Sequence, residues 1–171
     1  TALQLAIAIP AARTAAQRLR AVLMAGTAMG GGGIWAMHFI AMLACQMSIP
    51  VTYDITLTVL SALIAIASCA LGLGIAGIGI FSWSKLVAAG SFMGLGVAGM
   101  HYTGMAAMRM TPGIDYDPTL FGASLLIAVG ASAAALWIAF RLRQHSPYVR
   151  LIRAGAAVIM GVAIVGMHYT G

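Results

Sequence analysis

A histidine preceded by a methionine recurs three times along the sequence, and these residues are the ones best suited to chemistry. The copies read Met37-His38-Phe39, Met100-His101-Tyr102-Thr103-Gly104 and Met167-His168-Tyr169-Thr170-Gly171. Positions i, i+4 and i+7 of a helix share one face. The first copy then aligns His38 with Met42 and Cys45, and the second aligns His101 with Met105 and Met108. Imidazole with soft sulfur suits copper, above all Cu(I), far better than calcium, magnesium or manganese.

The competing interpretation is that methionine fills a membrane core and histidine makes a hydrogen bond between helices. The distribution of methionine argues against it. All twelve lie on the three motif helices or at their outer edges, and the equally apolar segments 55–81 and 119–140 contain none. Histidine inside a membrane is costly and usually functional. We therefore predict a metal site whose candidate ligands are His38, His101, His168, Met42, Met105, Met37, Met100, Met167, Met108 and Cys45.

The composition excludes an ordinary soluble domain. Of 171 residues, 62% are apolar and only 7% are charged, whereas a soluble domain has about 25% charged residues. Three aspartates and no glutamate argue against paired-carboxylate catalysis, and we expect no catalytic residues. The net charge of +6 would suggest nucleic acid in a soluble chain. Here the basic residues fall between apolar runs, so they indicate membrane topology instead, and nucleic acid is not an expected partner.

The apolar runs predict a polytopic, all-α transmembrane bundle. About 20 apolar residues cross a bilayer. Runs of that kind cover 21–45, 55–81, 86–108, 119–140 and 154–171, and a short run at 1–9 is expected to be the tail of a further helix. The chain, a single domain over 1–171, is therefore expected to be a fragment of a longer protein.

The charges between the runs predict an orientation. Eight of the nine basic residues fall on one side of the predicted spans: Arg13, Arg18, Arg20, Lys85, Arg141, Arg143, Arg150 and Arg153. The other side holds Arg109 and all three aspartates. The positive-inside rule places the first side in the cytoplasm. The motifs are then expected toward the periplasmic face of a bacterial inner membrane.

An internal repeat organises the chain. The first two histidines are 63 residues apart, and at that offset Met42 matches Met105, while Tyr53-Asp54 matches Tyr116-Asp117. The repeating unit is a two-helix hairpin, and the units cover about 21–81, 86–140 and 154–171. Met93 and Met160 each precede their histidine by eight residues. Met29 precedes His38 by nine, with the extra residue inside Gly30-Gly31-Gly32-Gly33.

These repeats predict how the site is built. Polar side chains that face lipid are expensive, so we expect the three motif helices to be neighbours and their histidines to converge. Met42 and Met105 are expected to point the same way as their histidines, being one turn further on. The aspartates at the starts of 55–81 and 119–140 could guide cations to the site, but we expect them to be helix N-caps instead. Small residues such as Gly90 and Gly94 are expected to let helices approach closely.

The three motifs and the Tyr-Asp pairs resemble those of the MHYT domain, a bacterial integral-membrane sensor module, over essentially the whole chain. The resemblance implies copper bound by methionine and histidine, and sensing of a diatomic gas (oxygen, carbon monoxide or nitric oxide) or of redox state. It also implies relay to a cytoplasmic signalling output, commonly cyclic-di-GMP enzymes or a histidine kinase. The first motif departs from the family pattern, with Phe39-Ile40 where the other copies have Tyr-Thr.

Two alternatives to the copper sensor stay open at this point. Two histidines at equal depth would serve as axial ligands of a haem. The chain would also serve as a structural subunit or transporter component of a larger membrane complex. The expected partners are the lipid bilayer, a diatomic gas, and a cytoplasmic signalling domain or other membrane subunits. Association with a second copy of the chain is left open.

Overall fold

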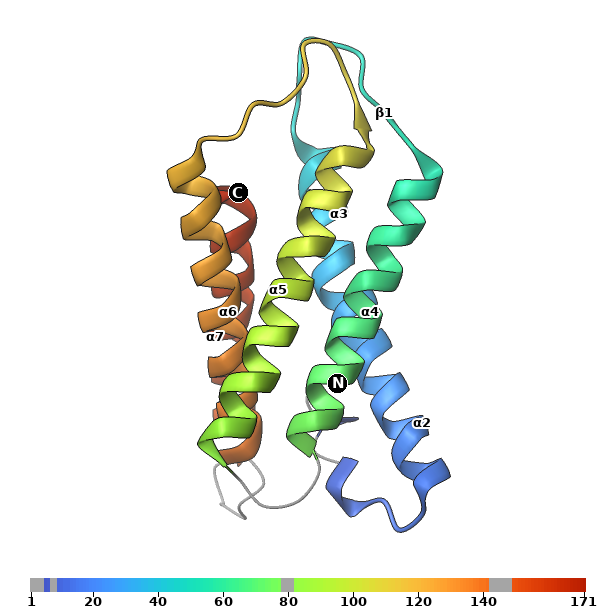
Figure 1. The fold of residues 1–171 in the computed structure, drawn as a ribbon, viewed down its shortest axis with the longest axis vertical. Helices are drawn as coiled ribbons and strands as arrows, with labels where there is room; N and C mark the ends of the chain where they lie inside the picture. Colours follow the sequence, from blue (N-terminus) through green and yellow to red (C-terminus); the bar gives the residue numbers. More distant parts are fainter. Residues whose placement is uncertain (1–4, 7–8, 78–81, 142–148) are drawn as a thin grey trace.

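The computed structural model describes residues 5–6, 9–77, 82–141 and 149–171, and its helices run side by side along one long axis (Figure 1). The elements in chain order are η1 (Ile9–Ala11), α2 (Ala15–Gly26), η2 (Thr27–Trp35), α3 (Ala36–Ala44), β1 (Thr52–Tyr53), α4 (Ile55–Gly77), α5 (Trp83–Ala107), β2 (Met108–Arg109), α6 (Pro118–Arg141) and α7 (Val149–Thr170). The expected all-α bundle is confirmed. The predicted run at 1–9 is described only at 5–6 and 9, and Arg143 lies outside the described residues.

The helices pack as a chain of neighbours. α5 packs against both α4 and α6, α7 packs against α6, and α4 also packs against α2 and η2. α2, η2 and α3 follow one another without a break as a 30-residue helical segment, Ala15–Ala44. Its middle part, η2, is a π-helix, a wider turn that accommodates an extra residue within a helix. It contains all four consecutive glycines.

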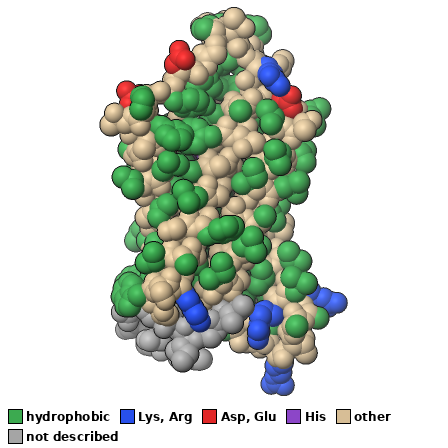
Figure 2. Space-filling model, viewed as in Figure 1, with side chains coloured by type: hydrophobic (Ala, Val, Ile, Leu, Met, Phe, Trp, Pro, Cys, Tyr) green, Lys and Arg blue, Asp and Glu red, His purple; other side chains and the backbone are tan. Residues whose placement is uncertain are grey.

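The outer surface of the bundle is apolar. Large hydrophobic side chains such as Leu126 and Leu151 are more than 70% exposed, and Figure 2 shows hydrophobic side chains along the length of the visible face. Ala15–Ala44, Ile55–Gly77 and Pro118–Ile138 are long and apolar enough to cross a membrane. α5, with 25 residues, is as long, but the glycines and polar residues of its motif make it less apolar. The chain is thus a membrane protein by length and composition of its helices.

Charged side chains mark the two ends of the bundle, as Figure 2 shows. We call the end with β1 and β2 the ribbon end and the opposite end the basic end.

One boundary prediction was wrong, because the first long helix begins at Ala15 and not at residue 21. Thr14 and Gln17 form a reciprocal capping box that starts the helix. Arg18 and Arg20, expected in a loop, therefore lie on α2.

Glycines set the closest helix contacts. A methyl group at Gly30 would collide with the backbone of Ala65 on α4, and one at Gly94 would collide with the backbone of Val129 on α6. A methyl group at Gly90 would collide with Cβ of Ala133 on α6. The predicted role of Gly90 and Gly94 in close helix packing is therefore confirmed.

At the ribbon end, the two loops that follow α3 and α5 pair with each other. β1 and β2 are antiparallel, with Thr52 opposite Arg109 and Tyr53 opposite Met108. Asp54 caps α4 by accepting a hydrogen bond from the Leu57 backbone N–H, and its other oxygen accepts from Arg109 at 2.8 Å. Arg109, the exception to the charge asymmetry, is thus paired with an acid.

Asp117 has the equivalent position before α6. Its carboxylate accepts hydrogen bonds from the backbone N–H groups of Thr119 and Leu120. The N-cap prediction is therefore confirmed for both aspartates. The Arg109 hydrogen bond is the main cause that lowers the pKa of Asp54, and backbone hydrogen bonds lower the pKa of Asp117.

Candidate metal centre

Three histidines from three helices meet near the ribbon end. His38 on α3, His101 on α5 and His168 on α7 form a cluster that we call the histidine trio. The Nδ1 atom of His38 lies 3.0 Å from Nδ1 of His168 and 3.3 Å from Nδ1 of His101. A set of potential ligand atoms, one from each ring, lies within 4.8 Å of one another. The prediction that the motif helices bring their histidines together is confirmed.

The trio is enclosed by the bundle. His38 and His101 are each only 1% exposed, and His168 is partly buried. The rings contact one another edge to face, with centroids 4.9–5.3 Å apart. Phe39 and Tyr102 pack against the rings of His38 and His101, respectively. This shell limits contact between the trio and bulk water.

The second and third motifs each end in a glycine, and each glycine makes room for the histidine of the motif before it. A methyl group at Gly104 would collide with Nε2 of His38. One at Gly171 would lie 2.9 Å from Nε2 of His101 and equally close to the Tyr102 hydroxyl. Each motif therefore supplies a histidine to the trio, and the later two also supply the space that a neighbouring ring occupies. Sequence reasoning did not identify this role.

Side chains near the first two histidines tie their helices to neighbouring helices. The Trp35 indole N–H donates to the Ser61 hydroxyl at 3.0 Å, which ties the junction of η2 and α3 to α4. The hydroxyls of Tyr102 and Ser124 are 2.6 Å apart and tie α5 to α6. Thr103 donates to the carbonyl of Gly99 within its own helix, and Thr170 does the same to Gly166. The Tyr102 hydroxyl thus has a structural use that Phe39 cannot reproduce by hydrogen bonding, whereas Tyr169 of the third copy is 75% exposed.

Hydrogen bonding alone does not satisfy the trio. Nδ1 of His38 faces two other Nδ1 atoms, and either tautomer leaves its Nε2 without a partner, because that atom is buried and unpaired among the described residues. A buried polar group without a hydrogen bond costs about 1–3 kcal/mol. Nitrogen ligands at about 2.0 Å around a tetrahedral ion are about 3.3 Å apart. The Nδ1 separations of 3.0 and 3.3 Å match that spacing.

The same geometry disfavours haem between two of these histidines. Axial ligands bind opposite faces of the macrocycle, which must lie between them. Here the nitrogen atoms are at hydrogen-bond distance and the rings are in direct contact. A planar macrocycle has no place between them in this arrangement.

Two predicted sulfur ligands do not lie on the histidine-bearing helices. α3 ends at Ala44 and α5 ends at Ala107, so Cys45 and Met108 are extended residues beyond the helix ends. The expected i, i+4, i+7 face is therefore wrong at its last position in both copies. For Met108 the physical reason is the ribbon, because Met108 pairs with Tyr53. Cys45 is exposed.

The remaining predicted methionines occupy different surroundings. Met42 is buried on α3. Met100 and Met167 are each 1% exposed and belong to the hydrophobic core, whereas Met37 is half-buried. Met105 lines an outer pocket of about 230 Å³ at the ribbon end, together with Met108, Met110, Tyr102 and Tyr116. Whether any of these sulfur atoms binds a metal stays a prediction.

Comparison with known proteins places these features in a family. The model of the MHYT family, described as a bacterial signalling protein N-terminal repeat, matches residues 31–89 and 94–151. The chain is 55% identical over 149 residues to the bifunctional diguanylate cyclase/cyclic di-GMP phosphodiesterase MucR of Pseudomonas aeruginosa, covering 87% of this chain and 22% of that protein. It is 33% identical over 151 residues to the signaling protein YkoW of Bacillus subtilis, covering 87% and 19%. The chain thus spans about a fifth of the curated relatives it matches. No solved structure matches it.

Proposed function

Because this chain belongs to the MHYT family of bacterial signalling proteins, we propose that it is a membrane sensor domain in which the histidine trio binds one copper ion. The observation that carries this proposal is the convergence of three histidines, one from each repeat, in which Nδ1 of His38 lies within 3.3 Å of Nδ1 of both other rings. Imidazole is a good ligand for copper in both oxidation states, and a buried, apolar shell favours the singly charged Cu(I) over harder divalent ions. His38, which is adjacent to both other rings, is the central ligand.

Three protein ligands leave one coordination position open. Metal sites that exchange small ligands are commonly built in this way, with three protein donors and one free position. The ligand proposed for this position is a diatomic gas: oxygen, carbon monoxide or nitric oxide. Bound copper supplies a soft centre for such a ligand, while the protein's own residues hold the three nitrogens in place and exclude water. A change of copper oxidation state is the alternative signal at the same site.

The proposed orientation places the ribbon end in the periplasm and the basic end in the cytoplasm. It follows from the positive-inside rule and from the pairing of Arg109 with Asp54, which neutralises the one basic side chain at the ribbon end. α5 and α7 then span the bacterial inner membrane with the other long helices. The trio lies on the periplasmic side, within reach of an external gas or metal.

The proposed output is a shift of α7 relative to α5 and α3. His168 is the least buried member of the trio, and it joins α7 to the site. A ligand shifts such an equilibrium only by the difference of its affinities for the two arrangements. Two of the longer relatives are named as cyclic-di-GMP enzymes, and we propose that a cytoplasmic signalling domain receives the signal here.

Metal analysis of the purified protein in lipid nanodiscs tests the proposal. We expect one copper per chain after loading with Cu(I), no Soret band, and strong loss of copper in His38→Leu. Leucine suits a membrane helix at least as well as histidine, so insertion is expected to continue. His145→Leu, the same change outside the three motifs, is the matched control. A Soret band in the protein as purified, or unchanged copper in His38→Leu, would contradict the proposal.

A second variant separates sulfur as ligand from sulfur as filler. Met105→Leu conserves volume and apolarity, so packing alone predicts a cost below about 1.5 kcal/mol and no change in copper. If Met105 is a ligand, Cu(I) retention falls while the thermal unfolding temperature stays near that of the unchanged protein.

A further inference from the structure

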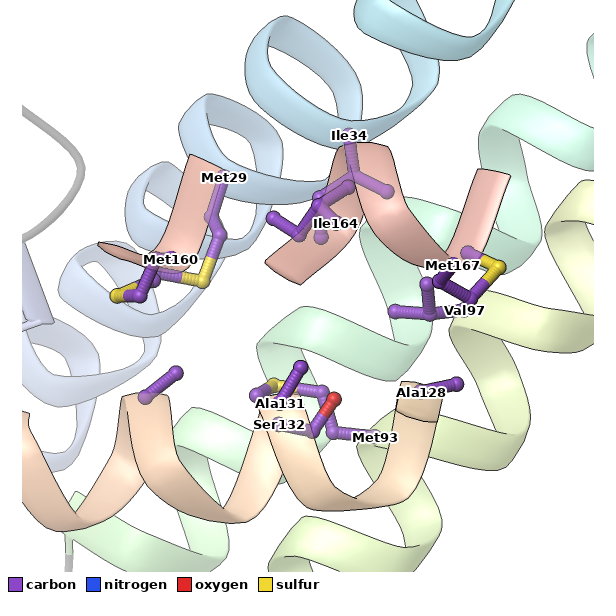
Figure 3. A pocket seen from close by; sticks show the side chains of 11 residues that line it. Met29, Ile34, Met93, Val97, Ala128, Ala131, Ser132, Met160, Ile164 and Met167 are labelled. Atoms are coloured by element: carbon purple, nitrogen blue, oxygen red, sulfur yellow. The ribbon is translucent and has the colours of Figure 1, made fainter. Parts of the chain in front are cut away.

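A cavity lies on the basic-end side of the histidine trio, and all three repeats contribute to its wall. We call it the inner cavity. It is lined by residues of η2, α5, α6 and α7, whose side chains surround the space in Figure 3. The centre of a water-sized sphere can occupy about 20 Å³ of it. About 10–15 Å³ in the same measure is enough for one water molecule, so the cavity has room for one small molecule.

The wall consists of two layers that repeat the spacing of the motifs. Four residues before each histidine stands a branched aliphatic residue: Ile34, Val97 or Ile164. One turn further toward the basic end stands a methionine: Met29, Met93 or Met160. Positions four apart on a helix lie on the same face. The histidine layer, the aliphatic layer and the methionine layer are thus stacked along the inner faces of the three motif helices.

The π-helix keeps the first repeat in register with the other two. Met29 is nine residues before His38, while the equivalent methionines are eight residues before His101 and His168. An ordinary α-helix would turn Met29 away by about 100°. η2 absorbs the extra residue by its wider turn, and Met29 lines the inner cavity with Met93 and Met160.

The lining suits an apolar guest and disfavours water. Among the residues that line the inner cavity, Ser132 carries the only polar side chain, whereas a buried water needs about two to four polar partners. Enclosed apolar cavities stay dry and bind guests such as xenon, and the inner cavity has such a lining although it is partly open to its surroundings. Thioether sulfur is polarizable, and methionine is flexible, so the methionine layer can adapt to a guest and attract it by dispersion.

We propose that the inner cavity binds one small apolar gas molecule next to the trio, as a site separate from the metal. The identification of its physiological guest as a diatomic gas rests on the proposed function; the binding of an inert apolar atom does not. The guest would contact Ile34, Val97 and Ile164, one turn from each ring. The cavity would thereby hold the gas close to the copper ligands and tie its presence to the packing of α7.

Xenon binding to the copper-free protein in nanodiscs tests this directly. We expect a ¹²⁹Xe NMR signal distinct from xenon in lipid. Ala131 lines the cavity, so Ala131→Leu fills it and should abolish that signal. Ala134 is exposed on the same helix, so Ala134→Leu is the matched control and should keep it. Val97→Ala, which removes two methyl groups from the wall, should increase xenon occupancy and guards against misfolding of the filled variant.

Two results would overturn the proposal: no protein-bound xenon signal in the unchanged chain, or equal signals in Ala131→Leu and Ala134→Leu. The histidine variant separates this proposal from the metal site. His38→Leu should lose copper but retain xenon binding. Xenon binding without copper would leave the inner cavity established and refute the metal proposal, and copper binding without xenon would do the reverse.

Discussion

Between Met29 and His38 the first motif helix contains one residue more than the second has between Met93 and His101. The second helix, α5, is continuous from Trp83 to Ala107. The first is α-helical at both ends and a π-helix in the middle, where four glycines follow one another. Both nevertheless place a histidine in the trio and a methionine in the inner cavity. Both also end at equivalent residues, Ala44 and Ala107. The repeat is therefore defined by which side chains reach the trio and the inner cavity, and the backbone conformation between them differs.

Shortening the second helix by one residue should have the largest effect on this equivalence. α5 has no wider turn to absorb a change of length, so deleting Leu95 turns the part of α5 before it by about 100° relative to the part that carries His101. Gly90, which packs against Ala133, would turn away, and a larger side chain would take its place. We expect a loss of about 3 kcal/mol or more in the free energy of unfolding, from overpacking. Thermal unfolding in detergent measures it.

The control is deletion of Gly32, which removes the residue that the wider turn of η2 absorbs and places Met29 eight residues before His38, as in the other two copies. An ordinary α-helix then keeps Met29 on the inner face, so this variant should lose much less stability than the Leu95 deletion. If the two deletions were equally costly, the register argument for η2 would be wrong.

The second difference is Gly104 on α5, which stands where the first motif has Ala41. Gly104→Ala puts a methyl group against Nε2 of His38. We expect a cost of about 1–3 kcal/mol from overpacking and a marked fall in copper per chain, because the central ring is displaced. In Ala41→Gly, copper should stay unchanged and the helix should lose about 1 kcal/mol. Equal copper in both variants would show that Gly104 does not position His38.

Tyr102 stands where the first copy has Phe39, and replacing it should have a smaller effect on the free energy of unfolding. Tyr102→Phe loses the hydrogen bond between the Tyr102 and Ser124 hydroxyls and should cost about 1 kcal/mol. In a Ser124→Ala background the same change should cost less, and this double-mutant cycle isolates the pair. Additive costs would mean that the two hydroxyls do not interact in the folded protein.

The pKa values of Asp54 and Asp117, the two helix-capping aspartates, should respond differently to the loss of Arg109. Both have a lowered pKa in the folded protein, chiefly through Arg109 for Asp54 and through backbone N–H groups for Asp117. A lowered folded pKa stabilises the fold above the unfolded pKa of about 3.9, and that stabilisation is lost as the pH falls through the folded pKa. Arg109→Gln should raise the pKa of Asp54 and leave that of Asp117 unchanged. Carboxyl ¹³C titration measures both values; a parallel rise would contradict the assignment.

The sequence predicted the helical class, the meeting of the three histidines and both aspartate caps, because each depends on local pattern. Apolar runs define helices, matched motif depth implies convergence, and Asp before a helix is a cap. It placed Met108 on a helical face because nothing local predicts that Met108 pairs with Tyr53, 55 residues earlier in the chain. It also placed Cys45 on a helical face, but α3 ends one residue earlier, at Ala44. The role of Gly104 was also out of reach, because it depends on which ring of another repeat lies opposite.

The inner cavity was only partly predictable from the sequence. The spacing of Met93, Val97 and His101 is readable in the sequence, and so is that of Met160, Ile164 and His168. The first copy keeps Ile34 four residues before His38 but has Met29 nine residues before it. The π-helix shows how Met29 still lines the cavity despite the extra residue.

The fit of His38 against Gly104, and of His101 against Gly171, also bears on how the protein is made. While the ribosome has delivered only the first motif, His38 has no glycine to lie against and no second ring beside it. The second motif completes that contact, but His101 still waits for Gly171, near the far end of α7. A nascent chain therefore carries no three-nitrogen site until its third motif has entered the bilayer. If the trio binds copper as proposed, metal capture would then report the insertion of all three motifs, and a product truncated before the third motif would not compete for copper at this site.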